Sequence, residues 1–213
     1  MDMLTLVMAA VLAVLPFGEQ HAAVLKETQV AAQNTLSDYQ QMVTKENFKR
    51  LGFETADEIK QATLGEPMLD YMVQLDDLKN YEAGTDPVKV LKPTNHVIYP
   101  VVVRAQTRSS LTLAKTDKGW ASVAYGSPAL IRSLTTLRAS GAASSRLSEG
   151  AYFSVRIPAF NLYLLGHRTD TTLMLTPVFD DPKLGLKAGE VAAADGLFQK
   201  LKPAAKEHDG LPR

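Results

Sequence analysis

Residues 111–128 read LTLAKTDKGWASVAYGSP, and this stretch predicts the fold class. Its two leading leucines alternate with polar residues, which is typical of a half-buried strand in an antiparallel sheet. Asp117-Lys118-Gly119 is a hairpin turn signal, so the chain is expected to return as a second strand over 120–125. Ser127 suits the N-cap of a helix, and Pro128 suits its first position. A hairpin that leads directly into a helix indicates an α+β protein with a mainly antiparallel sheet and packed helices.

Hydrophobic spacing predicts further helices and strands on both sides of this hairpin. Apolar residues spaced by three, four and seven predict an amphipathic helix over 25–48. Thr55 and Glu58 form a capping-box pattern before a short helix over 56–64. The other expected elements, in chain order, are strands over 69–75, 97–103 and 153–157, a helix from 128, a strand pair over 160–178 that reverses near 166–170, and a helix from 189. Their order favours antiparallel hairpins over strand-helix-strand crossovers.

A stretch of small and polar residues divides the chain into two α+β units. Residues 139–148, ASGAASSRLS, have the composition of a linker. A helical segment over 24–66 and a first α+β unit over 67–138 are expected before this linker. A second unit of two strands and a helix is expected over 149–213. A chain of 213 residues has room for one domain of ordinary size or for two small ones.

A short echo suggests that the two units are related. Residues 107–113, TRSSLTL, are echoed by residues 169–175, TDTTLML. Each copy follows a strand that contains proline and precedes an amphipathic helix, so the echo favours a structural repeat, with two unrelated hairpins as the alternative. Repeated strand-hairpin-helix units resemble the cystatin-like and PepSY-like modules of exported bacterial proteins. The resemblance lies in element order, so it implies an α+β module and assigns a role to no residue.

The N-terminus predicts export. Residues 4–17, LTLVMAAVLAVLPF, form an uncharged and mostly apolar run with the length of a signal-peptide core. This run is shorter than the about 20 residues that span a bilayer. Small residues at positions 22 and 23 suit a cleavage site, so residues 1–23 are expected to be a signal peptide. The alternatives are a buried N-terminal helix and an uncleaved anchor over 4–17, and only the anchor places the protein at a membrane.

Composition and motifs exclude several classes of function. The chain carries 23 basic and 23 acidic side chains, so it has no excess positive charge with which to bind nucleic acid. It contains no cysteine, which excludes disulfides, thiol nucleophiles and zinc-thiolate sites. The sequence has no glycine-rich phosphate loop, no metal-binding histidine spacing and no calcium-loop pattern. Neither a cofactor nor a metal is therefore expected.

Three groups of polar residues are candidates for catalysis, and each has a simpler interpretation. The pair Ser109-Ser110 lacks the G-x-S-x-G setting of a nucleophile and suits an ordinary strand. His96 and His167 lack metal-ligand spacing and are expected in exposed loops. The doublets Asp76-Asp77 and Asp180-Asp181 suit a helix start and a turn. No catalytic residue is therefore assigned, and a hydrolase with dispersed carboxylate and histidine residues remains an alternative.

Five aromatic residues form the predicted binding surface, namely Trp120, Tyr99, Tyr125, Tyr152 and Tyr163. The alternative is that they fill the space between sheet and helices. The expected function is that of an exported, non-catalytic protein of the bacterial envelope or exterior. It would bind a protein, a peptide or an envelope component through a sheet face or a strand edge. A carrier that holds a small ligand between sheet and helix is the other non-catalytic alternative.

Overall fold

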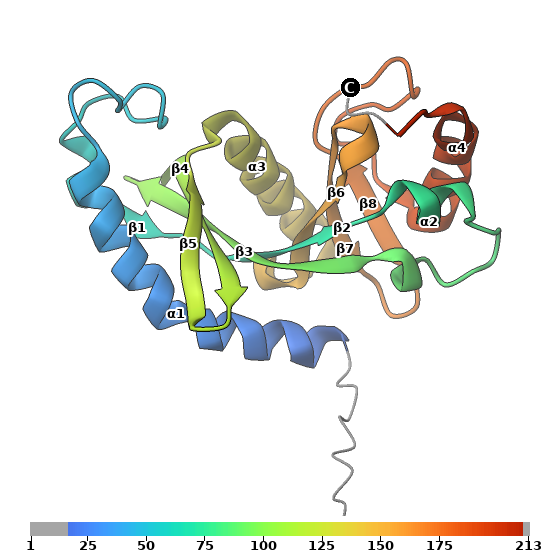
Figure 1. Cartoon of the computed structure of the whole chain (residues 1–213), viewed down its shortest axis with the longest axis horizontal. Coiled ribbons are helices and arrows are strands. Elements are labelled where there is room, and N and C mark those ends of the chain that lie inside the picture. Colours follow the sequence, from blue (N-terminus) through green and yellow to red (C-terminus); the bar gives the residue numbers. More distant parts are fainter. Residues whose placement is uncertain (1–16, 211–213) are drawn as a thin grey trace, which may run out of the picture.

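A single mostly antiparallel sheet organises the protein, and the predicted α+β class is confirmed (Figure 1). The computed structural model describes residues 17–210. In chain order the elements are α1 (Phe17–Met42), η1 (Glu58–Gln61), β1 (Thr63–Leu64), β2 (Met68–Met72), α2 (Leu75–Lys79), η2 (Pro87–Val90), β3 (Lys92–Val103), β4 (Gln106–Thr116), β5 (Gly119–Tyr125), α3 (Pro128–Ser145), η3 (Glu149–Ala151), β6 (Tyr152–Ile157), η4 (Pro158–Phe160), β7 (Leu162–Arg168), β8 (Leu173–Pro177), β9 (Ala192–Ala193) and α4 (Ala194–Glu207). The elements labelled η are single turns of 3-10 helix.

Two meanders lie side by side in this sheet. The strand order is β5-β4-β3-β2-β6-β7-β8-β9, with β1 paired to β3. Strands β2 to β5 form the first meander and β6 to β9 the second, and each pairs antiparallel within itself. The meanders meet where β2 and β6 pair in parallel, with Asp70 opposite Ser154 and Met72 opposite Arg156. The centre of the sheet is therefore built from segments that are far apart in the sequence.

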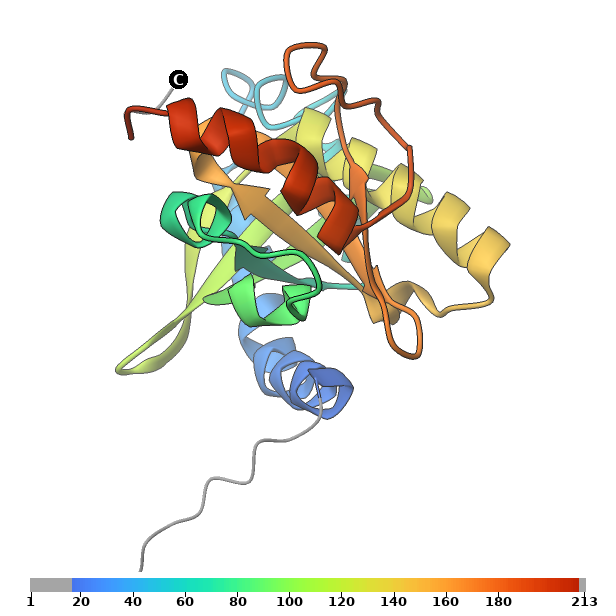
Figure 2. The same cartoon turned by 90° about the vertical axis from the view of Figure 1, so that its right-hand side faces the viewer.

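Helices cover both faces of the sheet. Helix α1 crosses one face of the first meander, while α2 and α4 lie against the same face of the second (Figures 1 and 2). Helix α3 packs on the opposite face. Side chains alternate along each strand, so Phe153 and Val155 of β6 enter the core under α1 and α4, whereas Tyr152 lies under α3. The sheet thus separates two apolar layers.

The predicted linker is mostly helical. Residues 139–145 form the last turns of α3, and the two meanders share one sheet across the predicted domain boundary. The small residues serve close packing: a side chain at Gly141 would place its Cβ 2.8 Å from the hydroxyl of Tyr152. The small residues over 139–145 therefore allow α3 to pack closely on the sheet. A single sequence does not distinguish such a packing segment from a flexible linker, because both are rich in small residues.

Several predicted elements differ in their bounds. The first helix ends at Met42, whose carbonyl accepts a hydrogen bond from the Asn47 side chain at 2.8 Å. The expected helix over 56–64 shrinks to η1, and residues 63–64 pair with β3 as strand β1. The Glu58 carboxylate accepts from the backbone N–H of Glu54 at 2.6 Å, so the predicted capping box is not formed. The last helix begins at Ala194 rather than near 189, since the two residues before it pair with β8 as strand β9.

The two halves share an element order, but the sequence echo does not mark equivalent positions. Each meander is followed by a helix, and α3 and α4 lie on opposite faces, as a two-fold axis along the central strands would require. A two-fold axis parallel to the central strands exchanges the two faces of the sheet, so equivalent residues of the two halves would lie on opposite faces. Leu113 and Leu175 are aligned in the echo, yet both lie in the same core layer. Ser109 and Ser110 lie within β4, whereas residues 171–172 of the second copy form a turn.

The predicted signal peptide lies mostly outside the described residues. Residues 17–23 form the first turns of α1, and the predicted apolar core over 4–17 falls outside them except for its last residue. Among the helices that the structure describes, none combines the length and apolarity needed to cross a bilayer.

Candidate functional site

Three of the five predicted aromatic residues lie between the sheet and α1. The hydroxyl of Tyr99 is 2.7 Å from that of Thr28 on α1. Tyr125 stacks on Tyr39 of the same helix, with ring centroids 4.5 Å apart. Trp120 packs against the same core from β5. These rings pack α1 against the first meander and do not form a solvent-facing binding surface.

The other two aromatic residues lie on the opposite face. Tyr152 is 1% exposed, and its hydroxyl is 3.0 Å from that of Ser145 in α3. Tyr163 is half-buried and lines a cavity. The structure therefore does not gather the five residues into the single binding surface that the sequence predicted, and of the five only Tyr163 lies at the cavity described below.

The serine pair is structural. Ser109 and Ser110 are successive strand residues, so their side chains enter opposite faces of the sheet. The hydroxyl of Ser109 is 2.8 Å from that of Tyr39, and the hydroxyl of Ser110 donates to the carbonyl of Gly126 at 2.6 Å. Both are buried, at 0% and 5% exposed, so neither side chain faces solvent.

The two histidines do not meet. His96 is on β3 and His167 on β7, with β2 and β6 between them, so three strand spacings of about 4.8 Å keep them roughly 14 Å apart. Neither lies in a loop, which corrects the sequence interpretation. His167 is 8% exposed beside the Tyr152 ring, and this burial lowers its pKa. In residues 17–210 no cluster of three or more histidine or acidic residues is arranged to hold a metal ion.

The carboxylate doublets organise their own loops. Asp77 begins α2 and lies 3.6 Å from the ammonium of Lys92. Asp180 accepts a hydrogen bond from the backbone N–H of Ala188 at 2.8 Å, and Asp181 accepts from that of Leu184 at 3.1 Å. Neither doublet lines the cavity beside Tyr163. Their geometry matches the helix start and the turn that the sequence predicted.

A cavity of about 370 Å³ lies between the first turns of α3 and the central strands. The chain leaves β5 through Gly126 and Ser127, whose φ angles are +105° and +53°, and this turn sets the start of α3 over the sheet. Ser127 occupies the predicted N-cap position, but its side chain makes no capping hydrogen bond and lines the cavity instead. The apolar walls come from α3 and its neighbours, namely Leu130, Ile131, Leu134, Ile98, Val123 and Tyr163.

The floor of the cavity holds a buried carboxylate. Asp70 of β2 is 3% exposed, and its Oδ2 forms an ion pair with Arg156 Nη2 at 2.9 Å and accepts a hydrogen bond from Thr94 Oγ1 at 3.0 Å. His96 Nδ1 lies 3.9 Å from the same oxygen. A bulge in β3 near Asn95, whose φ is +58°, lies opposite Asp70 and brings Thr94 to the carboxylate. The Arg156 side chain is 33% exposed, so the ion pair connects the buried floor with solvent.

Polar atoms at this floor lack partners. Oδ1 of Asp70, Oγ of Ser154 and Nε of Arg156 are buried and have no hydrogen bond of strict geometry among the described residues, although the Ser154 hydroxyl interacts with the Asp70 carboxylate and thereby opposes the rise of its pKa. Burial raises the pKa of Asp70, and Arg156, Thr94, Ser154 and His96 oppose that shift without cancelling it. Buried polar atoms without partners are uncommon in folded proteins. Their convergence on one cavity indicates a place for a polar ligand group.

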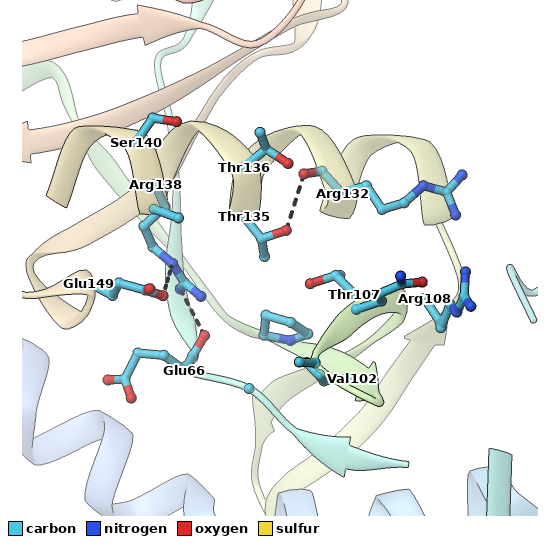
Figure 3. A pocket seen from close by; sticks show the side chains of 15 residues that line it. Glu66, Val102, Thr107, Arg108, Arg132, Thr135, Thr136, Arg138, Ser140 and Glu149 are labelled. Atoms are coloured by element: carbon cyan, nitrogen blue, oxygen red, sulfur yellow. Dashed lines mark hydrogen bonds and ion pairs between the residues drawn. The ribbon is translucent and has the colours of Figure 1, made fainter. Parts of the chain in front are cut away.

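A second hollow, of about 600 Å³, lies beside the middle and C-terminal half of α3 (Figure 3). Its buried cation is Arg138, which is 2% exposed, donates to the carbonyl of Glu66 at 2.8 Å and pairs with Glu149 at 3.1 Å. Burial lowers the pKa of Arg138, and both glutamates oppose this shift. At the other end Arg108 pairs with Glu58 at 2.8 Å. Glu149 and Glu58 balance the charges of Arg138 and Arg108. Among the described residues, Nε of Arg138 is the one buried side-chain atom of this hollow without a hydrogen bond of strict geometry, whereas the Asp70 cavity has three such atoms and is the stronger candidate site.

Sequence reasoning missed the residues at the floor of the cavity. The alternation of the strand predicted over 69–75 places Asp70 on the face opposite Leu69 and Tyr71, which in a half-buried strand is the solvent face. The signal that could have found the site is Arg156, a charged residue inside the buried strand FSVRI. An arginine in a strand whose other residues are buried is stabilised by an anionic partner, so this strand pointed to an acid on a neighbouring strand.

Comparison of the chain with models of protein families, with curated proteins and with solved structures finds no match. Functional inference therefore depends on the residues of this chain and on the geometry of the Asp70 cavity.

Proposed function

We propose that the protein is an exported, non-catalytic binding protein that holds a small amphiphilic molecule in the Asp70 cavity. One observation carries the proposal: a buried ion pair with unpartnered polar atoms forms the floor of a cavity whose walls are apolar. Ligand sites typically combine a mostly apolar lining with a few convergent polar groups, and their volumes start at about 300 Å³. The Asp70 cavity has both properties.

The geometry favours binding over catalysis. The hydroxyl of Ser110, which lines the cavity, donates to a backbone carbonyl and not to a base. Oδ2 of Asp70 and Nδ1 of His96 are 3.9 Å apart, too far for the hydrogen bond that orients a catalytic histidine. Asp70 is instead held by Arg156 and Thr94. These contacts fix a binding group in place.

Export is supported by the sequence of the N-terminus. Its run over 4–17 is apolar and uncharged, and small residues follow at positions 22 and 23. A protein, a peptide or an envelope component as a macromolecular partner stays a prediction.

The ligand proposal is tested with an organic-solvent extract of cells that make the protein. Purified protein is incubated with the extract, re-isolated by gel filtration, and its bound compounds are identified by mass spectrometry. Ala124→Trp should abolish retention, because Ala124 is exposed on β5 and lines the cavity, so an indole there fills the space without entering the core. Ala121→Trp is the matched control, since Ala121 is also exposed on β5 but does not line the cavity.

The expected result is that wild type and Ala121→Trp retain the same compound and Ala124→Trp does not. Equal retention by the two tryptophan variants, or no retention by wild type, would refute ligand binding in this cavity. Far-ultraviolet circular dichroism of the three proteins shows whether the fold is kept.

A further inference from the structure

If the protein binds a ligand in the Asp70 cavity as proposed above, the polar floor of the cavity restricts which ligand it accepts. Asp70 and Arg156 carry opposite charges and are joined at 2.9 Å, so the buried floor is close to neutral. A ligand with a net charge would leave that charge uncompensated at a partly desolvated floor, which is unfavourable. A carboxylate would also face Asp70, and an ammonium would face Arg156. Charge balance therefore favours a neutral head group.

The unpartnered atoms define the hydrogen bonds that this head group makes. Oδ1 of Asp70 is an acceptor, Nε of Arg156 is a donor, and Oγ of Ser154 can act as either. Asp70 and Ser154 are directly paired across the β2–β6 junction. The Ser154 hydroxyl already interacts with the Asp70 carboxylate, so a ligand that supplies partners to Asp70 Oδ1 and Arg156 Nε must bring a donor and an acceptor side by side.

The apolar walls of the cavity determine what the rest of the ligand must be. Ile131 and Leu134 are buried on α3 and face the sheet across the cavity. A volume of about 370 Å³ holds about twelve non-hydrogen atoms at roughly 30 Å³ each. An alkyl or similar apolar body of this size fills the space beneath α3 while its head group lies on the floor.

We infer that the ligand is a small amphiphile whose uncharged head group carries one hydrogen-bond donor beside one acceptor, as a primary carboxamide does. Asp70 accepts from the donor, Arg156 donates to the acceptor, and the Ser154 hydroxyl completes the set. Water occupies such floors in many proteins, and the ligand replaces its hydrogen bonds with equivalent ones while its apolar body gains contact with the walls.

The inference is tested by isothermal titration calorimetry of the full chain at pH 8 with four ligands of one chain length. Decanamide carries the proposed head group, decanoate is anionic, decylammonium is cationic, and N,N-dimethyldecanamide keeps the acceptor but lacks the donor. Decanamide should bind at least tenfold more tightly than each of the other three. Equal or tighter binding of decanoate, decylammonium or the dimethyl amide overturns the inference.

Two variants separate recognition from general packing. Asp70→Asn leaves the charge of Arg156 unbalanced, so decanoate should become the tighter ligand, a reversal that a merely structural role of Asp70 does not produce. An unchanged preference contradicts the assignment. Ser154→Ala should weaken decanamide several-fold without reversing the preference, and it serves if the Asp70 variant does not fold. The Ala124→Trp variant should bind none of the four.

The outcomes also distinguish this inference from the proposed function. If no decyl compound binds but the cell-extract experiment recovers a compound that Ala124→Trp loses, the head-group assignment is wrong and ligand binding stands. If both experiments fail, both proposals are wrong.

Discussion

Removal of Arg156 should expose how strongly the cavity floor depends on its ion pair. In Arg156→Met the Asp70 carboxylate stays 3% exposed but loses its 2.9 Å partner, while Thr94 at 3.0 Å and His96 at 3.9 Å remain. Breaking a buried pair costs about 3 to 5 kcal/mol. Because Arg156 is itself 33% exposed, we expect the lower end, about 3 kcal/mol at pH 7. For a domain of this size that lowers Tm by about 6 to 12 °C.

The loss should depend on pH, with a sign set by Asp70. Burial raises the pKa of this carboxyl in the folded state above its ordinary value of 3.8, so the folded protein binds the proton more tightly than the unfolded chain does. The protonated acid therefore stabilises the folded state. This contribution to the free energy of unfolding is fully present below the pKa of Asp70 in the unfolded chain, and it is lost as pH rises through the pKa of Asp70 in the folded protein. Arg156→Met raises the folded pKa further, so its deficit relative to wild type should be small near pH 4 and largest near pH 8.

Urea denaturation of wild type, Arg156→Met, Asp70→Asn and the double variant at both pH values measures these differences. In the Asp70→Asn background, Arg156→Met should cost less than about 1 kcal/mol, because the buried charge is gone. A deficit that is absent at pH 7, constant with pH or equally large in the Asp70→Asn background would show that the ion pair does not control the stability of the floor.

Two further predictions concern α1 and its connection to the sheet, and each compares a test substitution with a control. Gly52→Ala should cost about 2 to 4 kcal/mol in urea denaturation, since φ at Gly52 is +98° and a Cβ would lie 2.1 Å from the carbonyl oxygen of Arg108. Gly84→Ala, at φ +77° with open space around it, should cost only about 1 kcal/mol, and equal losses would contradict the steric argument. Tyr39→Phe should cost about 1 to 2 kcal/mol by leaving the buried hydroxyl of Ser109 unpaired. Adding Ser109→Ala should recover part of that loss, and a double variant no more stable than Tyr39→Phe alone would count against this explanation.

Local signals predicted the elements well, and the reason is visible in the hairpin of β4 and β5. Asp117-Lys118-Gly119 encodes a turn within a few residues, so Thr116 and Gly119 pair where the sequence predicts. The junction of β2 and β6 has no such local code, because its strands lie far apart in the sequence and meet in parallel. The division into two units by a linker over 139–148 failed for the same reason, since only the sheet shows that the halves are continuous.

The site was harder to predict than the fold because alternation groups residues by face without saying what covers each face. Asp70 alternates with apolar neighbours as a solvent-facing residue does, yet α3 and the second meander bury it. Trp120 and Tyr163 were both predicted to belong to one binding surface but lie on opposite faces of the sheet. Burial of a polar strand residue depends on tertiary packing, which one sequence does not display.

We expect the cavity to form late in folding, because its floor spans the parallel junction of β2 and β6. Asp70 belongs to one meander and Arg156 to the other, and three residue pairs hold the two in register. Contacts between such distant segments close large loops and form slowly, whereas each meander can pair locally. A half-folded chain therefore has no cavity floor, and a ligand that needs both residues binds only the completed sheet. By mass action that ligand would hold the two meanders together, so its supply would regulate how long the joined form survives.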